Sequence, residues 1–230
     1  MEKIQENIDQ VEARIAAACE AAGRSRDEVT LVAVSKKQPV TAIRVAADFG
    51  LTVFGENRVQ EAMVKMPELP GGLTWHLIGH LQTNKVRHVI HAEFALIHSV
   101  DSERLLLALE QEAETQGKTQ PILLQVNVSG EGSKFGVAPG ALPGLLEVAA
   151  GCTHLEVEGL MTMPPFTEDP EKAGPHFARL RTLRDEVAVS SGFPLQVLSM
   201  GMSHDLEIAI REGATMVRVG TDLFGTREKA

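Results

Sequence analysis

The stretch AVSKKQP (residues 33–39) places two lysines directly behind a short apolar run that ends at Val34. A valine-rich run of this kind is typical of a strand that is buried on both faces. A lysine at the end of such a strand can be desolvated, which makes its neutral amine more accessible for Schiff-base chemistry with an aldehyde. A solvated lysine at a strand end would give the same pattern. Because successive strand residues point to opposite faces, we expect Lys36 to carry the chemistry and Lys37 to be solvated.

Arg218 is the second candidate, within TMVRVGTDLFG (residues 215–225). Its neighbours in the strand are apolar, and Met216 and Arg218 share one face, which we expect to point into the interior of the fold. A buried arginine needs an acceptor, and a structural salt bridge to a glutamate is the alternative explanation for it. Gly220 and Thr221 then open a short helix, at a place where α/β barrels often hold phosphate.

The segment MGMSHDLEIAI (residues 200–210) is the third candidate. It predicts a strand that runs into a helix, with Ser203 as the N-cap and with Asp205 and Glu207 in the first turn. The backbone N–H groups of such a turn can bind an anion. An ordinary strand-to-helix junction with a good cap would explain the same residues.

The histidines do not predict a metal site. His76 and His80 lie four residues apart on a predicted strand, which separates them by roughly 13 Å. His88 and His91 are three residues apart on a predicted helix, but neither a third ligand nor an HExxH pattern accompanies them.

Eight strand-like runs position these residues: 30–35, 51–55, 74–79, 94–100, 121–128, 155–163, 195–201 and 214–220. Helical patterns separate them at 40–49, 57–66, 84–91, 102–116, 139–150, 170–190 and 204–212, and one more helix is expected at 1–22. Regular alternation of strands and helices predicts an α/β fold with right-handed parallel crossovers. We therefore expect one domain over residues 1–230, a (β/α)8 TIM barrel with an extra N-terminal helix. An open doubly wound sheet is the alternative, but no GxGxxG follows the first strand. The tail TDLFGTREK (residues 221–229) is expected to start one more short helix.

In such a barrel, ligands bind at the carboxyl ends of the strands, where the following loops meet. The residues that follow the predicted strands, many of them polar, converge on that face. They include Lys36, Asn57, Met202, Ser203, Gly220 and Thr221.

Composition narrows the class of protein. The formal net charge of −9 argues against a nucleic-acid surface, which needs a basic footprint. No uninterrupted apolar stretch approaches the roughly 18 residues of a membrane span, and the polar start is neither a signal nor a transit peptide. Cys19 and Cys152 are the two cysteines; they lie far apart and outside any CxxC, which favours a reducing cytoplasm.

Several motifs in order resemble the pyridoxal phosphate homeostasis protein family, relatives of the alanine racemase N-terminal barrel that bind pyridoxal phosphate (PLP). The matching stretches span nearly the whole chain: AVSKKQP, FGENRVQE, WHLIGHLQTNK, HSVDS, QVNVSGEGSKFG, GLMTM, LSMGMSHDLEIAI and TMVRVGTDLFG. The resemblance implies that Lys36 holds PLP as a Schiff base and that Arg218 faces the pyridine nitrogen. It also implies that Asn57 lines the pocket and that the phosphate lies on the backbone and hydroxyls of Met202, Ser203, Gly220 and Thr221.

The resemblance leaves open whether bound PLP is used for catalysis. A fold-related racemase uses a lysine and a tyrosine from an added domain, whereas this chain has no tyrosine and no residues left for that domain. An arginine at the pyridine nitrogen would keep that atom unprotonated and weaken the ring as an electron sink. We therefore expect a monomeric protein that buffers PLP or delivers it to PLP-requiring apo-enzymes, without substantial turnover. The alternatives are a weak PLP-dependent racemase or decarboxylase, and a barrel aldolase or sugar-phosphate isomerase that uses Lys36 without PLP.

Overall fold

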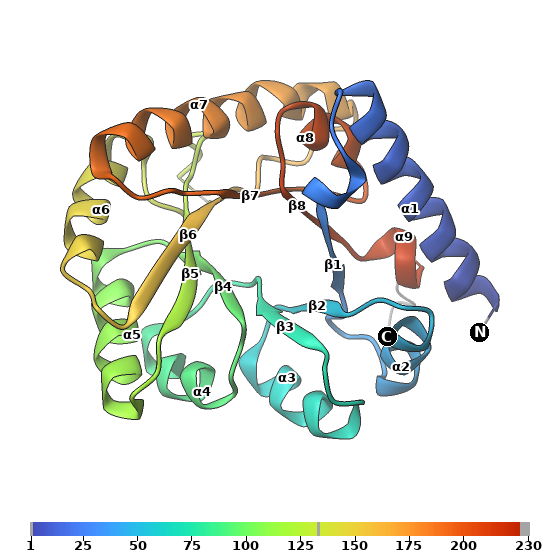
Figure 1. The fold of residues 1–230 in the computed structure, drawn as a ribbon, viewed down its shortest axis with the longest axis horizontal. Coiled ribbons are helices and arrows are strands. Elements are labelled where there is room, and N and C mark those ends of the chain that lie inside the picture. Colours follow the sequence, from blue (N-terminus) through green and yellow to red (C-terminus); the bar gives the residue numbers. More distant parts are fainter. Residues whose placement is uncertain (1, 133, 226–230) are drawn as a thin grey trace.

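The computed structural model describes residues 2–132 and 134–225. Within this part of the chain, eight parallel strands close into a barrel, because each strand pairs with the next and β1 pairs with β8 (Figure 1). The strands are β1 (Thr30–Val34), β2 (Val53–Glu56), β3 (Thr74–Leu77), β4 (Leu96–Val100), β5 (Gln120–Gln125), β6 (Leu155–Met161), β7 (Val197–Met202) and β8 (Met216–Val219). Closure confirms the predicted barrel and excludes the open sheet.

Helices surround the barrel on the outside (Figure 1). They are α1 (Glu2–Ala21), α2 (Val40–Asp48), α3 (Val59–Lys65), α4 (Val86–His91), α5 (Glu103–Gln116), α6 (Leu142–Ala150), α7 (Gly174–Ser191), α8 (Leu206–Arg211) and α9 (Thr221–Phe224). The N-terminal helix α1 is the predicted extra helix, and it packs against α8 and α9. Helix α9 is the short helix expected at the tail, while residues 226–229 of that stretch lie outside the described residues.

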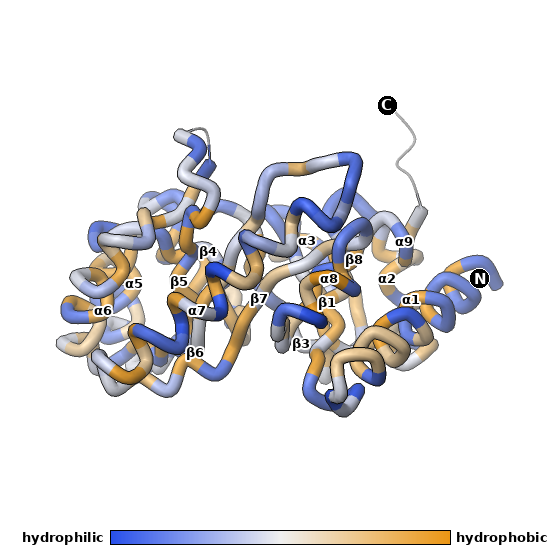
Figure 2. The backbone as a smooth tube through the Cα atoms, turned by 90° about the horizontal axis from the view of Figure 1, so that it is seen from above, coloured by the Kyte–Doolittle hydropathy of each residue, from blue (hydrophilic) through white to orange (hydrophobic). Residues whose placement is uncertain are grey.

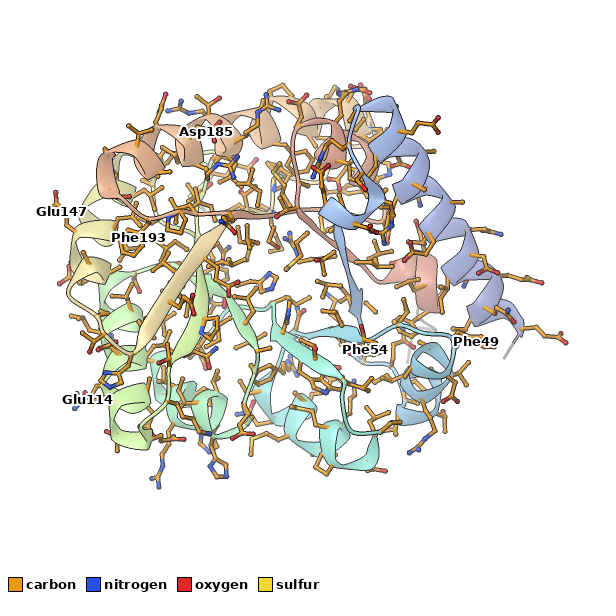
Figure 3. The ribbon with its side chains drawn as sticks, viewed as in Figure 1. Phe49, Phe54, Glu114, Glu147, Asp185 and Phe193 are labelled. Atoms are coloured by element: carbon orange, nitrogen blue, oxygen red, sulfur yellow. The ribbon has the colours of Figure 1, made fainter. Side chains whose placement is uncertain are left out.

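The core has two layers, which follow from the alternation of side chains along each strand. Inside the barrel, five side chains form a small apolar cluster: Val32, Leu96, Leu123, Met161 and Met216. A larger cluster lies between the barrel and the helices, and it includes Phe54 of β2 (Figure 3). Leu31 and Ala33 belong to this outer cluster while Val32 belongs to the inner one, so β1 is buried on both faces as predicted.

Charged side chains occupy the outer faces of the helices. Glu114, Glu147 and Asp185 are exposed and point away from the barrel on α5, α6 and α7 (Figure 3). The tube in Figure 2 shows the same division, with hydrophobic residues concentrated along the strands. In the described ranges, we find no helix with the length and apolarity that crossing a membrane would require.

Candidate functional site

A cavity of about 490 Å³ opens beside the carboxyl ends of β1, β2, β3, β7 and β8. This size lies within the usual range of pockets for small ligands. The cavity thus lies at the carboxyl ends of the strands, the side of the barrel on which the sequence predicted the ligand site. The lining contains all seven residues singled out from the sequence: Lys36, Asn57, Met202, Ser203, Arg218, Gly220 and Thr221.

Lys36 enters the pocket from the turn after β1. Ser35 is completely buried, Lys36 is half-buried and Lys37 is exposed, which agrees with the expected division between the two lysines. The turn closes through the Gln38 N–H group, which donates to the Ser35 carbonyl at 3.0 Å. Lys37 has a φ of 61°, so the backbone reverses immediately after Lys36.

Arg218 lies in the barrel interior and is only 3% exposed. Its Nη1 donates to Ser199 Oγ at 2.5 Å and its Nη2 donates to the Thr162 carbonyl at 2.9 Å. The acceptors are therefore a hydroxyl and a carbonyl, and the glutamate considered from the sequence is not the partner. These bonds use two of the five guanidinium N–H groups, and the side chain also lines the pocket. Burial lowers the pKa of Arg218 to about 10, opposed by the nearby Asp205 carboxylate, so the group stays cationic at neutral pH.

Two buried histidines extend the hydrogen bonding behind Arg218. His98 Nδ1 lies 2.9 Å from Ser199 Oγ, and His98 Nε2 lies 3.1 Å from His76 Nδ1. Burial lowers the pKa of His76 to about 4 and lowers the pKa of His98 well below 6.5, so both rings are neutral at pH 7. In the sequence, His76 was considered only as a metal ligand. Its hydrogen-bonded connection through His98 and Ser199 to Arg218 was not predicted. Among residues 2–132 and 134–225, no group of three or more His, Cys, Asp or Glu side chains is placed to hold a metal ion.

The loop after β7 differs from the sequence prediction. Ser203 is not the N-cap of α8, because the helix begins at Leu206 and Asp205 occupies the cap position. Asp205 Oδ1 accepts from the Met202 N–H group at 2.6 Å, which closes a turn before the helix can start. Ser203 Oγ instead accepts from the Asp222 N–H group at 3.4 Å, so it connects the loop after β7 to the loop after β8.

Arg14 of α1 contacts the segments that follow β7 and β8. Its guanidinium bonds Glu207 Oε1 at 2.6 Å and Asp222 Oδ2 at 2.5 Å, and it donates to the Ser203 carbonyl at 2.9 Å. The extra N-terminal helix is thereby tied to α8, to α9 and to the loop that carries Ser203. No local pattern in the sequence marks Arg14 for this role.

Two glycines allow the strand ends to approach closely. A Cβ atom at Gly220 would lie 3.2 Å from Val34 Cβ, so glycine lets the end of β8 sit against the end of β1. A Cβ atom at Gly79 would lie 2.3 Å from the Asn57 carbonyl oxygen, so only glycine fits between β3 and Asn57.

Two ring side chains that were not predicted from the sequence also line the pocket. The rings of His80 and Phe135 stack with centroids 3.8 Å apart, and both residues line the cavity. Phe135 is 54% exposed, so the stacked pair borders solvent as well as the pocket. Their separation in sequence gave no local signal for this contact.

Comparison with known proteins decides the family. The family model for the alanine racemase N-terminal domain matches residues 4–228. Pyridoxal phosphate homeostasis proteins from Aquifex aeolicus and Pseudomonas aeruginosa are each 46% identical to this chain, covering 97% and 99% of it and 98% and 97% of their own lengths. The chain belongs to the pyridoxal phosphate homeostasis protein family. The structure of PipY from Synechococcus elongatus with PLP bound is also similar, with a TM-score of 0.85 and 38% identity over 96% of this chain and all of that one. The resemblance seen in the sequence motifs is thus confirmed over nearly the whole chain.

Proposed function

We propose that this protein binds PLP in the cavity, linked to Lys36 as a Schiff base, and serves intracellular PLP homeostasis. The observation that carries the proposal is the convergence of Lys36, Asn57, Ser203, Arg218 and Thr221 on one cavity from strand ends far apart in sequence. The similar PipY structure has PLP bound, which supports the choice of ligand.

The residues of the cavity fit the chemistry of PLP. PLP, when bound, supplies an aldehyde, a phosphate and a pyridine ring. Lys36 offers an amine, and the hydroxyls of Ser203 and Thr221 offer donors for an anion. The N–H group of Thr221 opens α9 and has no acceptor within that helix. Arg218 has guanidinium N–H groups beyond the two used by Ser199 and Thr162, and these suit the lone pair of a pyridine nitrogen.

The Met202 N–H group is a weaker candidate for the phosphate than the sequence suggested. Asp205 Oδ1 already accepts from it, and a carboxylate there would repel a second anion. We propose that Met202 contributes to the wall of the pocket, while the loops carrying Ser203, Gly220 and Thr221 hold the phosphate.

We propose further that the protein carries PLP without substantial turnover. Arg218 remains a cation near neutral pH, so it donates to the pyridine nitrogen and supplies no proton to it. The full sequence contains no tyrosine, the residue type that serves as the second proton-transfer group in the related racemase. PLP-requiring apo-enzymes are the partners that such a carrier would supply.

The remaining assignments rest on the same architecture. We propose that residues 1–230 form one domain, because a single closed barrel includes every described strand and α1 packs on its helices. We propose a monomer, since the seven candidate residues of one chain already converge on a single cavity and the proposed site needs no residue from a second chain. Cys19 and Cys152 are both free thiols, which supports a reducing cytoplasm.

Reduction of the PLP-loaded protein with borohydride, followed by peptide mapping, tests the site. We expect a pyridoxyl group on Lys36 and yellow colour in the protein before reduction. A label mainly on Lys37 or Lys134 would show that the site is misassigned. Incubation with L-alanine in deuterated water separates carrier from racemase: formation of D-alanine at about 1–10³ per second would favour the racemase alternative.

A further inference from the structure

A buried cluster of charged residues lies beside the turn that carries Lys36. We define the Lys65 cluster as Ser35, Glu56, Glu61 and Lys65. Lys65 ends α3 and is 7% exposed, while Glu56 ends β2 and is completely buried. Lysine and glutamate are seldom buried to this degree unless they are paired, so the cluster needs an explanation.

The Lys65 ammonium group uses all its donors inside this cluster. Nζ lies 2.8 Å from Glu56 Oε1, 2.6 Å from Glu61 Oε1 and 2.9 Å from the Ser35 carbonyl oxygen. An ammonium group has three N–H bonds, so these contacts account for every one of them. Lys65 therefore joins two carboxylates to the main chain of Ser35.

The same carboxylates hold the residues on both sides of Lys36. Ser35 Oγ donates to Glu56 Oε1 at 2.7 Å, and the Ser35 N–H group donates to the Gly55 carbonyl at 3.0 Å. On the other side, the Lys37 N–H group donates to Glu61 Oε1. Lys36 is thus flanked by two residues whose backbone is fixed through one ammonium group.

We propose that Lys65 is a positioning residue for Lys36: by binding Ser35, Glu56 and Glu61 together, it fixes the backbone from which the Lys36 amine reaches the cavity. The inference rests on the proposed function, because it assigns a role in forming the link between Lys36 and PLP. In that step the Lys36 amine condenses with the aldehyde and one water is released. Placing the amine costs conformational entropy, and a backbone fixed in advance removes part of that cost.

Charge explains why the cluster depends on Lys65. Burial raises the pKa of Glu56, and the bonds from Lys65 and Ser35 oppose that shift. Glu56 Oε2 is buried and has no hydrogen-bond partner in the described structure, so the bonds to Oε1 are the ones that compensate this carboxyl group. Without Lys65, the two carboxylates and the Ser35 carbonyl lose their common donor, and we expect the turn at residues 35–38 to rearrange.

A double-mutant cycle separates positioning from general stability. The variants are Lys65→Met, Lys36→Ala and the two combined, and PLP binding is measured by absorbance and by equilibrium dialysis. We expect Lys65→Met to weaken PLP binding about tenfold when Lys36 is present, a typical coupling within one hydrogen-bonded network. In the Lys36→Ala background it should weaken binding less than about twofold, because no covalent link remains to be positioned.

Lys118→Met is the matched control. Lys118 pairs with Glu93 at 2.8 Å, as Lys65 pairs with its glutamates, but this pair lies on the surface. The side chain of Lys118 is 37% exposed and that of Glu93 is 75% exposed. We expect this variant to bind PLP as the unmodified chain does. Equal losses of affinity for Lys65→Met with and without Lys36 would overturn the proposal, and so would no loss in either background.

Amide hydrogen exchange without PLP tests the positioning independently of the proposed function. Lys65→Met should raise exchange at Gln38, whose N–H group is bonded to the Ser35 carbonyl, and Lys118→Met should not. Unchanged exchange at residues 35–38 would refute the inference even if PLP binds, whereas failure of the unmodified chain to bind PLP would refute only the proposed function. If Lys65→Met does not fold, Glu61→Ala carries the same test, because Glu61 is partly exposed and bonds both Lys65 and Lys37.

Discussion

Replacing Arg218 with glutamine should weaken PLP binding by one to two orders of magnitude. The guanidinium is 3% exposed and lines the cavity, so any bond it makes to a ligand is shielded from water. A hydrogen bond to a charged group contributes about 1.5–3 kcal/mol, and each 1.4 kcal/mol is about tenfold in affinity. We therefore expect Kd to rise roughly 10- to 150-fold.

The fold should survive this substitution. Arg218→Gln loses charged donors to Ser199 Oγ and the Thr162 carbonyl, which costs stability. It also removes a cation from a site where burial, partly opposed by Asp205, lowers the pKa of the guanidinium to about 10, and this relief offsets part of the loss. Ser199 keeps its contact with His98 at 2.9 Å. We expect the free energy of unfolding to change by less than about 2 kcal/mol.

Titration of the apoprotein with PLP, followed by absorbance and calorimetry, measures the effect. Arg181→Gln is the matched control, because Arg181 forms an ion pair with Glu212 at 3.3 Å on the surface and its side chain is 40% exposed. The control should retain the affinity of the unmodified chain. Unchanged affinity in Arg218→Gln would mean that Arg218 serves only Ser199 and Thr162, and the assignment to the pyridine nitrogen would be withdrawn.

Three other outcomes follow from the site. Lys36→Ala should lose the absorbance of the covalent link yet retain weak PLP affinity, because the groups proposed for the phosphate and ring remain; complete loss of binding would contradict this division. Arg14→Leu should lower the free energy of unfolding by about 1 kcal/mol, since its ion pairs are one-third exposed and screened, and should weaken binding of PLP and inorganic phosphate together. The pKa values of His76 and His98 are depressed below 6.5, so the unfolded chain binds more protons and stability should fall as the pH drops from 6.5 towards 4. Between pH 6.5 and about 4, His76 contributes up to about 1.4 kcal/mol per pH unit, so His76→Gln should flatten the decline measured by urea unfolding.

Much of the candidate site was predictable, because a barrel brings residues at the carboxyl ends of its strands to the same side of the fold. A strand of period two put Met216 and Arg218 on one face, and the structure has both inside the barrel. The carboxyl ends of parallel strands meet on one side, so Lys36, Asn57 and Thr221 were expected together before any contact was known. Neither inference needed the identity of a partner residue.

The partners were not predictable, since they depend on register and on contacts between distant segments. Arg218 lies opposite Met202 in the pairing of β7 with β8, yet its guanidinium bonds Ser199, which lies opposite Met216, and no local pattern reveals this diagonal contact. The assignment of Ser203 as the cap failed for a related reason. A serine directly before the predicted helix at 204–212 is a favoured cap, but the Asp205 side chain bonds the Met202 N–H group in a turn and the helix begins only at Leu206.

In the described structure, two buried or half-buried cations stabilise the segments on two sides of the cavity. No sequence pattern predicted a role for either one. Lys65 joins the ends of β1 and β2 beside the proposed amine, and Arg14 joins the segments that follow β7 and β8 beside the proposed phosphate site. Each cation links segments through carboxylates and one main-chain carbonyl, so each fixes backbone and not only side chains. The carrier role that we propose would require the protein to hold PLP in one geometry while the pocket stays open to a recipient. Bracing from behind the strand ends meets that need, because it leaves the mouth of the cavity to the loops and to the stacked rings of His80 and Phe135.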